Sequence, residues 1–193
     1  MAVAAQAMHH KALDRTAINR LGLWLFFFSE SVIFALLLSA RFFLQKLNIP
    51  EEENGGGQVV DQILGLGITS ILLLSSATAF TAETAIEHGK KSLGHWMILA
   101  TIVLGLIFAG GVAYEWKTAQ FQRGEVFGTV FFTMTGVHAA HVMSGVAMLG
   151  LVWFRAVRGK YDANNHWPVS GVVMYWHFVD VVWVFFYPAL YLV

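Results

Sequence analysis

Long apolar runs separated by polar segments dominate this chain. Five of the runs exceed the roughly 20 residues that a helix needs to cross about 30 Å of hydrocarbon. The first polar break holds a proline, three glutamates and three glycines, which is typical of a solvent loop. We therefore predict an all-α membrane protein, a bundle of five transmembrane helices. The predicted domains are an N-terminal tail over 1–20 and the bundle over 21–193, with spans at about 21–45, 62–86, 93–114, 126–154 and 169–193.

Composition supports a membrane protein and narrows its chemistry. The chain is 57% hydrophobic and only 12% charged, which is too apolar for a soluble domain of 193 residues. Its 12 basic and 12 acidic residues cancel, so no bulk charge favours nucleic acid. The chain has no cysteine, which excludes disulfides, thiolate zinc sites, iron–sulfur ligation and covalent c-type haem attachment within it.

The distribution of basic residues predicts the orientation. With five spans, the tail and the second and fourth loops lie on one side of the membrane and carry most of the lysines and arginines. Cytoplasmic loops are enriched in these residues. We therefore place the N-terminus in the cytoplasm and the C-terminus outside, in the periplasm. The basic residues assigned to the cytoplasmic side are Lys11, Arg15, Arg20, Lys90, Lys91, Arg155, Arg158 and Lys160.

Ionisable side chains lie inside three of the predicted spans. A charge at the bilayer centre costs about 2.5–3.5 kcal/mol, so such groups usually face a bundle interior and tend to be functional. The rise of about 1.5 Å per residue places all of them in one layer, somewhat to the cytoplasmic side of the midplane. We expect helices that carry this cost at one depth to provide partners for one another. The residues are Glu30, His138, His141, His177 and Asp180.

Two of these groups have a structural and a functional interpretation. Phenylalanine and isoleucine flank Glu30 at helical spacing, which favours a neutral hydrogen-bonding acid over a proton-carrying one. His177 and Asp180 are three residues apart and share a helix face. For them the favoured interpretation is a hydrogen-bonded pair between helices.

His138 and His141 have the spacing of a metal-binding pair, but both lie on one helix face. They cannot occupy the two axial positions of one haem, and a copper or di-iron site needs further ligands. Contacts that tie helices together are therefore favoured. A haem between His177 and one of these two histidines is geometrically possible, so a small haem b protein stays open. A self-standing proton or ion carrier that uses Glu30 and Asp180 is a third alternative.

The run Trp176–Trp183 (WHFVDVVW) resembles the signature of subunit III of cytochrome c oxidase, in the haem–copper oxidase superfamily. Three other segments resemble the same family in the same order. The resemblance extends from about Leu21 to the end of the sequence. These segments are Ser29-Glu30-Ser31 followed by Phe34, then Tyr114-Glu115-Trp116, and then 127–142 with its glycine, paired phenylalanines and two spaced histidines.

The sequence departs from parts of the family in two places. Longer members have seven helices and begin with two that are absent here, so the chain resembles the five-helix bacterial form. Some members carry paired histidines at the cytoplasmic end of the second span. Here Thr84 and Ala85 replace them, with His88 nearby.

The resemblance implies a non-catalytic subunit of a proton-pumping oxidase in the bacterial inner membrane. Such a subunit carries no cofactor or metal of its own, packs directly on catalytic subunit I, and holds structural phospholipids. The haems and copper belong to subunits I and II. The subunit is expected to support proton uptake from the cytoplasmic side and stability during turnover. Glu30 matches the buried carboxylate of the family, and Arg155 matches a basic position used for lipid headgroups. Arg158 lies one turn further on, where we expect it to attract anionic lipid.

Close relatives with the same terminal motif are alternatives. They are subunit III of a quinol oxidase and the similar subunit associated with nitric oxide reductase. Because the electron donor binds elsewhere in such complexes, this chain does not identify it.

Overall fold

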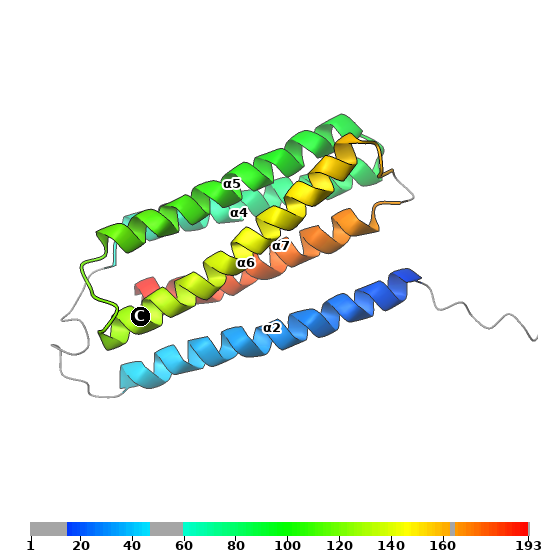
Figure 1. Ribbon diagram of the computed structural model, residues 1–193. Helices are drawn as coiled ribbons and strands as arrows, with labels where there is room; N and C mark the ends of the chain where they lie inside the picture. The colour runs from blue at the N-terminus through cyan, green and yellow to red at the C-terminus, as the bar shows by residue number, and fades with distance from the viewer. Residues whose placement is uncertain (1–14, 47–59, 163–164, 193) are drawn as a thin grey trace, which may run out of the picture.

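The computed structural model describes residues 15–46, 60–162 and 165–192, which fold into five long helices and a short π-helical turn (Figure 1). All five helices are long and apolar enough to cross a membrane. This confirms the predicted all-α architecture of five spans, while the orientation stays a prediction. The elements are α2 (Arg15–Lys46), α4 (Gln62–Glu87), α5 (Lys91–Thr118), α6 (Val126–Val157), α7 (Trp167–Tyr187) and η1 (Pro188–Leu192).

The helix ends differ from the predicted spans in two informative places. Helix α2 begins at Arg15, inside the predicted 1–20 tail, whose first 14 residues lie outside the described part of the chain. Helix α5 continues to Thr118, four residues beyond the predicted end at Tyr114. The predicted third span, 93–114, therefore ends too early, because Glu115 lies in the last turn of α5 and is 4% exposed.

The helices run alternately up and down, and α2 lies at the edge of the bundle (Figure 1). In an apolar stretch of 18 residues within the last span (Trp167–Leu192), 56% of the residues are buried within the chain. In the corresponding stretch of the first span (Ala17–Lys46), only 11% are buried. Helix α7 is therefore central, and most of α2 is left to contact lipid or another protein. The largest fully buried side chains cluster around α7 and include Trp176, Trp183, Phe186, Phe108 and Phe131.

Trp176 shows how the central helix is held. A Cβ atom added to Gly105 on α5 would lie 2.5 Å from its ring, and one added to Gly145 on α6 would lie 2.8 Å from it. Only glycine lets the two helix backbones come this close to the indole, which is how helices pack in a membrane without a hydrophobic drive between them. The two glycines thus clamp Trp176 between α5 and α6.

Indole hydrogen bonds join α7 to a third helix of the core, α4. Trp176 Nε1 donates to Ser75 Oγ at 3.0 Å, and Trp183 Nε1 donates to Thr69 Oγ1 at 2.9 Å. The donors are seven residues apart on α7 and the acceptors six apart on α4, so each pair repeats after about two helical turns. These bonds fix the register of α7 against α4.

Candidate functional site

Glu30 and His141 are brought together across the gap between α2 and α6. Glu30 Oε2 lies 3.0 Å from His141 Nε2, and the two side chains are 17% and 20% exposed. The other ring nitrogen, Nδ1, lies 2.8 Å from the carbonyl oxygen of Val137. A carbonyl oxygen can only accept a hydrogen bond, so Nδ1 carries a hydrogen.

This assignment fixes the number of protons that the pair holds. With Nδ1 protonated, the contact with Glu30 requires one further proton between Nε2 and the carboxylate. The pair is then either an imidazolium with a carboxylate or a neutral imidazole with a carboxylic acid. Both arrangements hold one shared proton and have no net charge. Glu30 therefore has the polar partner that its depth in the predicted span demands.

His177 is held by a different helix. Its Nδ1 lies 2.7 Å from Ser76 Oγ on α4, which joins α7 to α4. The ring is partly exposed and forms part of the wall of an apolar groove between α7 and α2. His177 thus has a hydrogen-bond partner on a neighbouring helix.

Asp180 lies one turn further along α7 and is 4% exposed. Neither of its carboxyl oxygens meets hydrogen-bond geometry with a described residue. The hydroxyl of Ser76, which contacts His177, also lies near the Asp180 carboxyl group. A buried polar group without a good partner is costly. Asp180 is therefore a poorly satisfied member of the predicted polar layer.

His138 lies in an aromatic environment in the bundle core. Its ring is fully buried, with ring centroids 4.7 Å from Trp183, 5.7 Å from Phe108 and 6.2 Å from Phe186. Neither ring nitrogen has a partner among the described residues. The packed rings leave no room for a porphyrin at His138. Both nitrogens of His141 are already occupied, so neither residue fits the haem site that the sequence left open.

The predicted polar layer therefore divides into separate contacts. Glu30 joins His141, His177 joins Ser76, and His138 packs against aromatic rings. Within the described ranges, no three histidine, aspartate or glutamate side chains are grouped so as to hold a metal ion.

Arg155 and Arg158 lie at the end of α6 and are exposed. The Arg155 guanidinium lies 5.9 Å from the ring of Tyr161, and that of Arg158 lies 3.8 Å from the ring of Phe154. The aromatic rings hold both cations at the rim of the bundle, where an anionic headgroup could reach them.

A second polar network, which the sequence did not indicate, lies at the other end of the bundle. Arg41 is 8% exposed, and its Nε donates to the carbonyl oxygen of Ala189 at 3.1 Å. Tyr191 donates to Glu115 Oε2 at 2.6 Å, and Gln62 Nε2 donates to the Tyr191 carbonyl at 3.0 Å. These bonds anchor η1 to α2, α4 and α5. Two signals were available: Arg41 lies inside an apolar run, and Glu115 lies in the family-like segment Tyr114-Glu115-Trp116.

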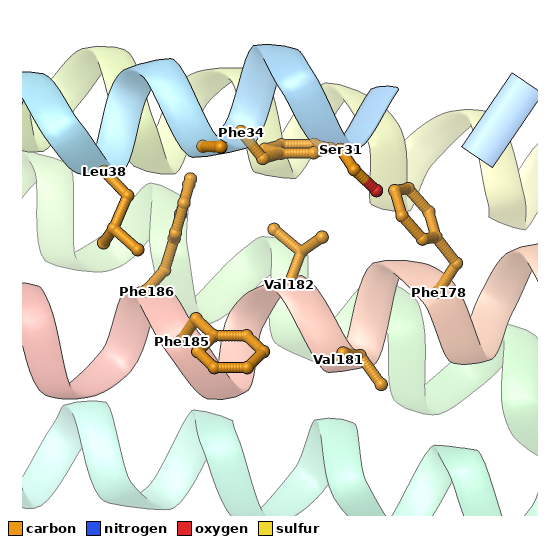
Figure 2. A pocket seen from close by; sticks show the side chains of 9 residues that line it. Ser31, Phe34, Leu38, Phe178, Val181, Val182, Phe185 and Phe186 are labelled. Atoms are coloured by element: carbon orange, nitrogen blue, oxygen red, sulfur yellow. The ribbon is translucent and has the colours of Figure 1, made fainter. Parts of the chain in front are cut away.

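Two apolar grooves separate α2 from α7. One has a volume of about 290 Å³, and Figure 2 shows Phe34 and Leu38 of α2 facing Phe178, Val182 and Phe186 of α7. The other, of about 520 Å³, lies nearer the start of α2. Because both are lined almost wholly by apolar side chains, they suit hydrocarbon chains rather than polar ligands.

The fold and these contacts define a multi-pass helical membrane protein whose buried polar groups join helices. Comparison with known proteins identifies it further. The family model for cytochrome c oxidase subunit III matches residues 2–193. The chain belongs to the cytochrome c oxidase subunit III family, in its five-helix form. Members of this family are subunits of the oxidase and carry no metal centre of their own.

Individual relatives agree with the family model. The chain is 34% identical over 175 residues to cytochrome c oxidase subunit 3 of Thermostichus vulcanus, covering 89% of this chain and 86% of the relative. It is 36% identical to the Neurospora crassa protein of that name, over 89% of this chain and 66% of the relative. For the Marchantia polymorpha protein the identity is 34%, over 95% of this chain and 71% of the relative. The chain thus spans about two thirds of the longer relatives.

Proposed function

We propose that this chain is the non-catalytic subunit III of a proton-pumping cytochrome c oxidase in a bacterial inner membrane. In this role it packs on subunit I, while subunits I and II hold the haems and copper. It supports proton uptake from the cytoplasmic side and the stability of the complex during turnover. Membership of the family supports the assignment to the oxidase.

The pair formed by Glu30 and His141 is the observation that carries the proton-related part. Shifting its shared proton between the carboxylate and the imidazole leaves the net charge of the pair unchanged. Such a shift avoids the cost of moving a net charge within the membrane. The side chains are partly exposed, so the proton can be exchanged through water or a neighbouring subunit. A group of this kind can hold a proton close to an uptake path.

The outer surface of the bundle supports the partner and lipid assignments. Exposed large apolar side chains cover one face of α2, and we propose that subunit I and phospholipid acyl chains cover such faces. Arg155 and Arg158 would bind anionic headgroups at the cytoplasmic rim. The most exposed large apolar residues of α2 are Leu21, Trp24, Leu25, Phe28, Leu36 and Phe43.

The assignment to the oxidase is tested by purification of the tagged chain from its native membrane in a mild detergent. Mass spectrometry then identifies the accompanying proteins, and a reduced-minus-oxidised spectrum records their haems. We expect a haem–copper subunit I to co-purify and the haem signal to disappear when this chain is isolated from it. A chain that migrates alone and keeps a haem band would contradict the proposal.

The proton-related role is tested separately in the purified oxidase. Glu30→Gln keeps a group that can donate to His141 Nε2 but cannot release a proton. We expect proton uptake during turnover to slow while the haem content stays unchanged. Ser29→Ala serves as the control, because its hydroxyl bonds only locally to the Phe26 carbonyl at 2.8 Å among the described residues. Equal uptake rates in Glu30→Gln and the wild type would contradict this role.

A further inference from the structure

A polar cavity of about 230 Å³ lies at the end of the bundle that holds η1, between the start of α4 and the end of α5. In contrast to the grooves beside α2, it is lined mainly by polar groups. Two carboxylates from different helices, Asp61 and Glu115, meet at it. The full lining comprises Val60, Asp61, Glu115, Thr118, Ala119, Gln120 and Phe121.

Glu115 is the buried member of this pair of carboxylates. It is 4% exposed, and its Oε2 accepts the hydrogen bond from Tyr191. Its Oε1 has no hydrogen-bond partner among the described residues. A buried carboxylate oxygen without a partner carries a large desolvation cost, which a bound cation would offset. The side chain therefore faces the cavity with an unused acceptor.

Asp61 brings a second negative charge to the cavity from the exposed side. Its Oδ1 accepts hydrogen bonds from the backbone nitrogens of Ile63 and Leu64 at 3.0 Å each, which caps α4. Its charge lies close enough to act on Glu115 electrostatically. In the described ranges, neither carboxylate forms an ion pair with lysine or arginine. The cavity thus has two negative groups, and no basic side chain of the described residues is in contact with them.

The end of α5 adds further oxygen atoms. The helix ends at Thr118, and the carbonyl oxygen of Glu115 accepts from the nitrogen of Ala119 at 2.8 Å. The last carbonyl groups after it lack partners within the helix and carry partial negative charge. Thr118, Ala119 and Gln120 follow one another along the cavity wall. No histidine, cysteine or methionine is part of the lining, so the available donors are oxygen atoms. Such a set suits a hard cation and disfavours zinc or copper.

We propose that this cavity binds a calcium ion, held by Asp61 and Glu115 and completed by backbone carbonyls of the α5 end and by water. Calcium accepts six to eight oxygen ligands in irregular geometry, which an arrangement with two carboxylates and a helix end can provide. With so few charged ligands, the affinity should lie on the order of 10⁻⁴–10⁻³ M. The ion would join the start of α4 to the end of α5 beside η1.

The position of the cavity makes it accessible to a soluble ion. Helix α5 has 28 residues and is therefore about 42 Å long, which exceeds the roughly 30 Å of hydrocarbon. Glu115 lies three residues before its end, at the level of the membrane interface. Calcium can reach this level from water without crossing lipid.

Equilibrium dialysis with radioactive calcium tests the proposal on the full chain, purified in mild detergent with the subunits that accompany it. The wild type is compared with Asp61→Asn, Glu115→Gln and the control Glu87→Gln. Glu87 is exposed at the opposite end of α4. Asparagine caps a helix as well as aspartate does, and glutamine still accepts from Tyr191, so both site variants should fold. Folding is checked by circular dichroism.

We expect the wild type and Glu87→Gln to bind one calcium ion per chain more than Asp61→Asn and Glu115→Gln. Any calcium bound to the accompanying subunits is the same in all four samples. It therefore does not affect this difference, whichever subunits co-purify. Equal stoichiometry in all four samples would overturn the proposal. If Glu115→Gln fails to fold, Asp61→Asn decides the outcome alone.

Discussion

Glu30 and His141 are separated by 111 residues in sequence and joined by a contact of 3.0 Å between the carboxylate and the imidazole. This contact ties the edge helix α2 to α6 at the level of the predicted polar layer. Arg41 ties the same helix to η1 at the far end. These two polar contacts hold α2 along a largely apolar face, where the stacked rings of Phe27 and Phe178 add a further contact.

Two substitutions of Glu30 distinguish the contribution of its hydrogen bond to stability from the contribution of its charge. In Glu30→Gln the amide can still donate to His141 Nε2, so we expect a change in the free energy of unfolding below about 1 kcal/mol. In Glu30→Ala the imidazole loses its partner, which should cost about 1–3 kcal/mol. The stability changes of both variants are measured by thermal unfolding of the purified chain and by the yield of the complex. Loss of assembly in Glu30→Gln would show that the pair needs the carboxylate.

The clamp around Trp176 predicts opposite effects for two glycines on one helix. In Gly145→Ala the new methyl group collides with the indole, and overpacking of this kind typically costs about 1–3 kcal/mol. In Gly150→Ala a Cβ meets nothing within 4 Å, so the helix should gain up to about 1 kcal/mol from propensity alone. The melting temperatures should move in opposite directions. A similar loss in both variants would mean that the clamp is not tight.

Trp183 should be far more sensitive than Trp24 to replacement by phenylalanine. Trp183 is fully buried and donates to Thr69, so its loss removes volume and leaves the hydroxyl without its donor. We expect Trp183→Phe to cost about 2–4 kcal/mol. Trp24 is 65% exposed, and Trp24→Phe should have almost no effect on unfolding of the chain in detergent. Equal denaturation curves for the two variants would contradict the packing described here.

Asp180 should tolerate loss of its charge better than loss of its size. The carboxyl group is buried without a good hydrogen bond or a described cation in contact, so the neutral amide of Asp180→Asn fits the same space at little cost. Asp180→Ala leaves a cavity and should lower the yield and the thermal stability. If Asp180→Asn were the more damaging variant, the carboxylate would have to pair with a positive group on another subunit.

The sequence predicted the five helices because lipid forces each backbone segment to satisfy its own hydrogen bonds over a fixed length. The rise per residue also predicted that polar residues on different helices would be partners, and Glu30 and His141 are in contact. It did not predict the direction of each side chain. His138 and His141 are only three residues apart, yet one enters the aromatic core and the other meets α2.

The polar network at η1 was not predictable for a related reason. Charge counting assumes that residues near span ends face water. By that rule Arg41, near the end of the first predicted span, and Glu115, just beyond the third, would be exposed. Each is buried by a partner far away in sequence, Ala189 for Arg41 and Tyr191 for Glu115. Such pairings depend on how α7 and η1 sit against the other helices, which no local pattern contains.

The placement of the partners of α2 has a consequence for biosynthesis. Helix α2 is the first of the five to leave the ribosome, but its contact with His141 lies 111 residues later and its contact with Ala189 lies 148 residues later. During synthesis Glu30 and Arg41 therefore remain in the membrane or at its surface without these partners. The first of the five helices to be inserted therefore gains these polar contacts only after α6 and η1 have been synthesised. During that interval insertion factors or a neighbouring subunit can act on it.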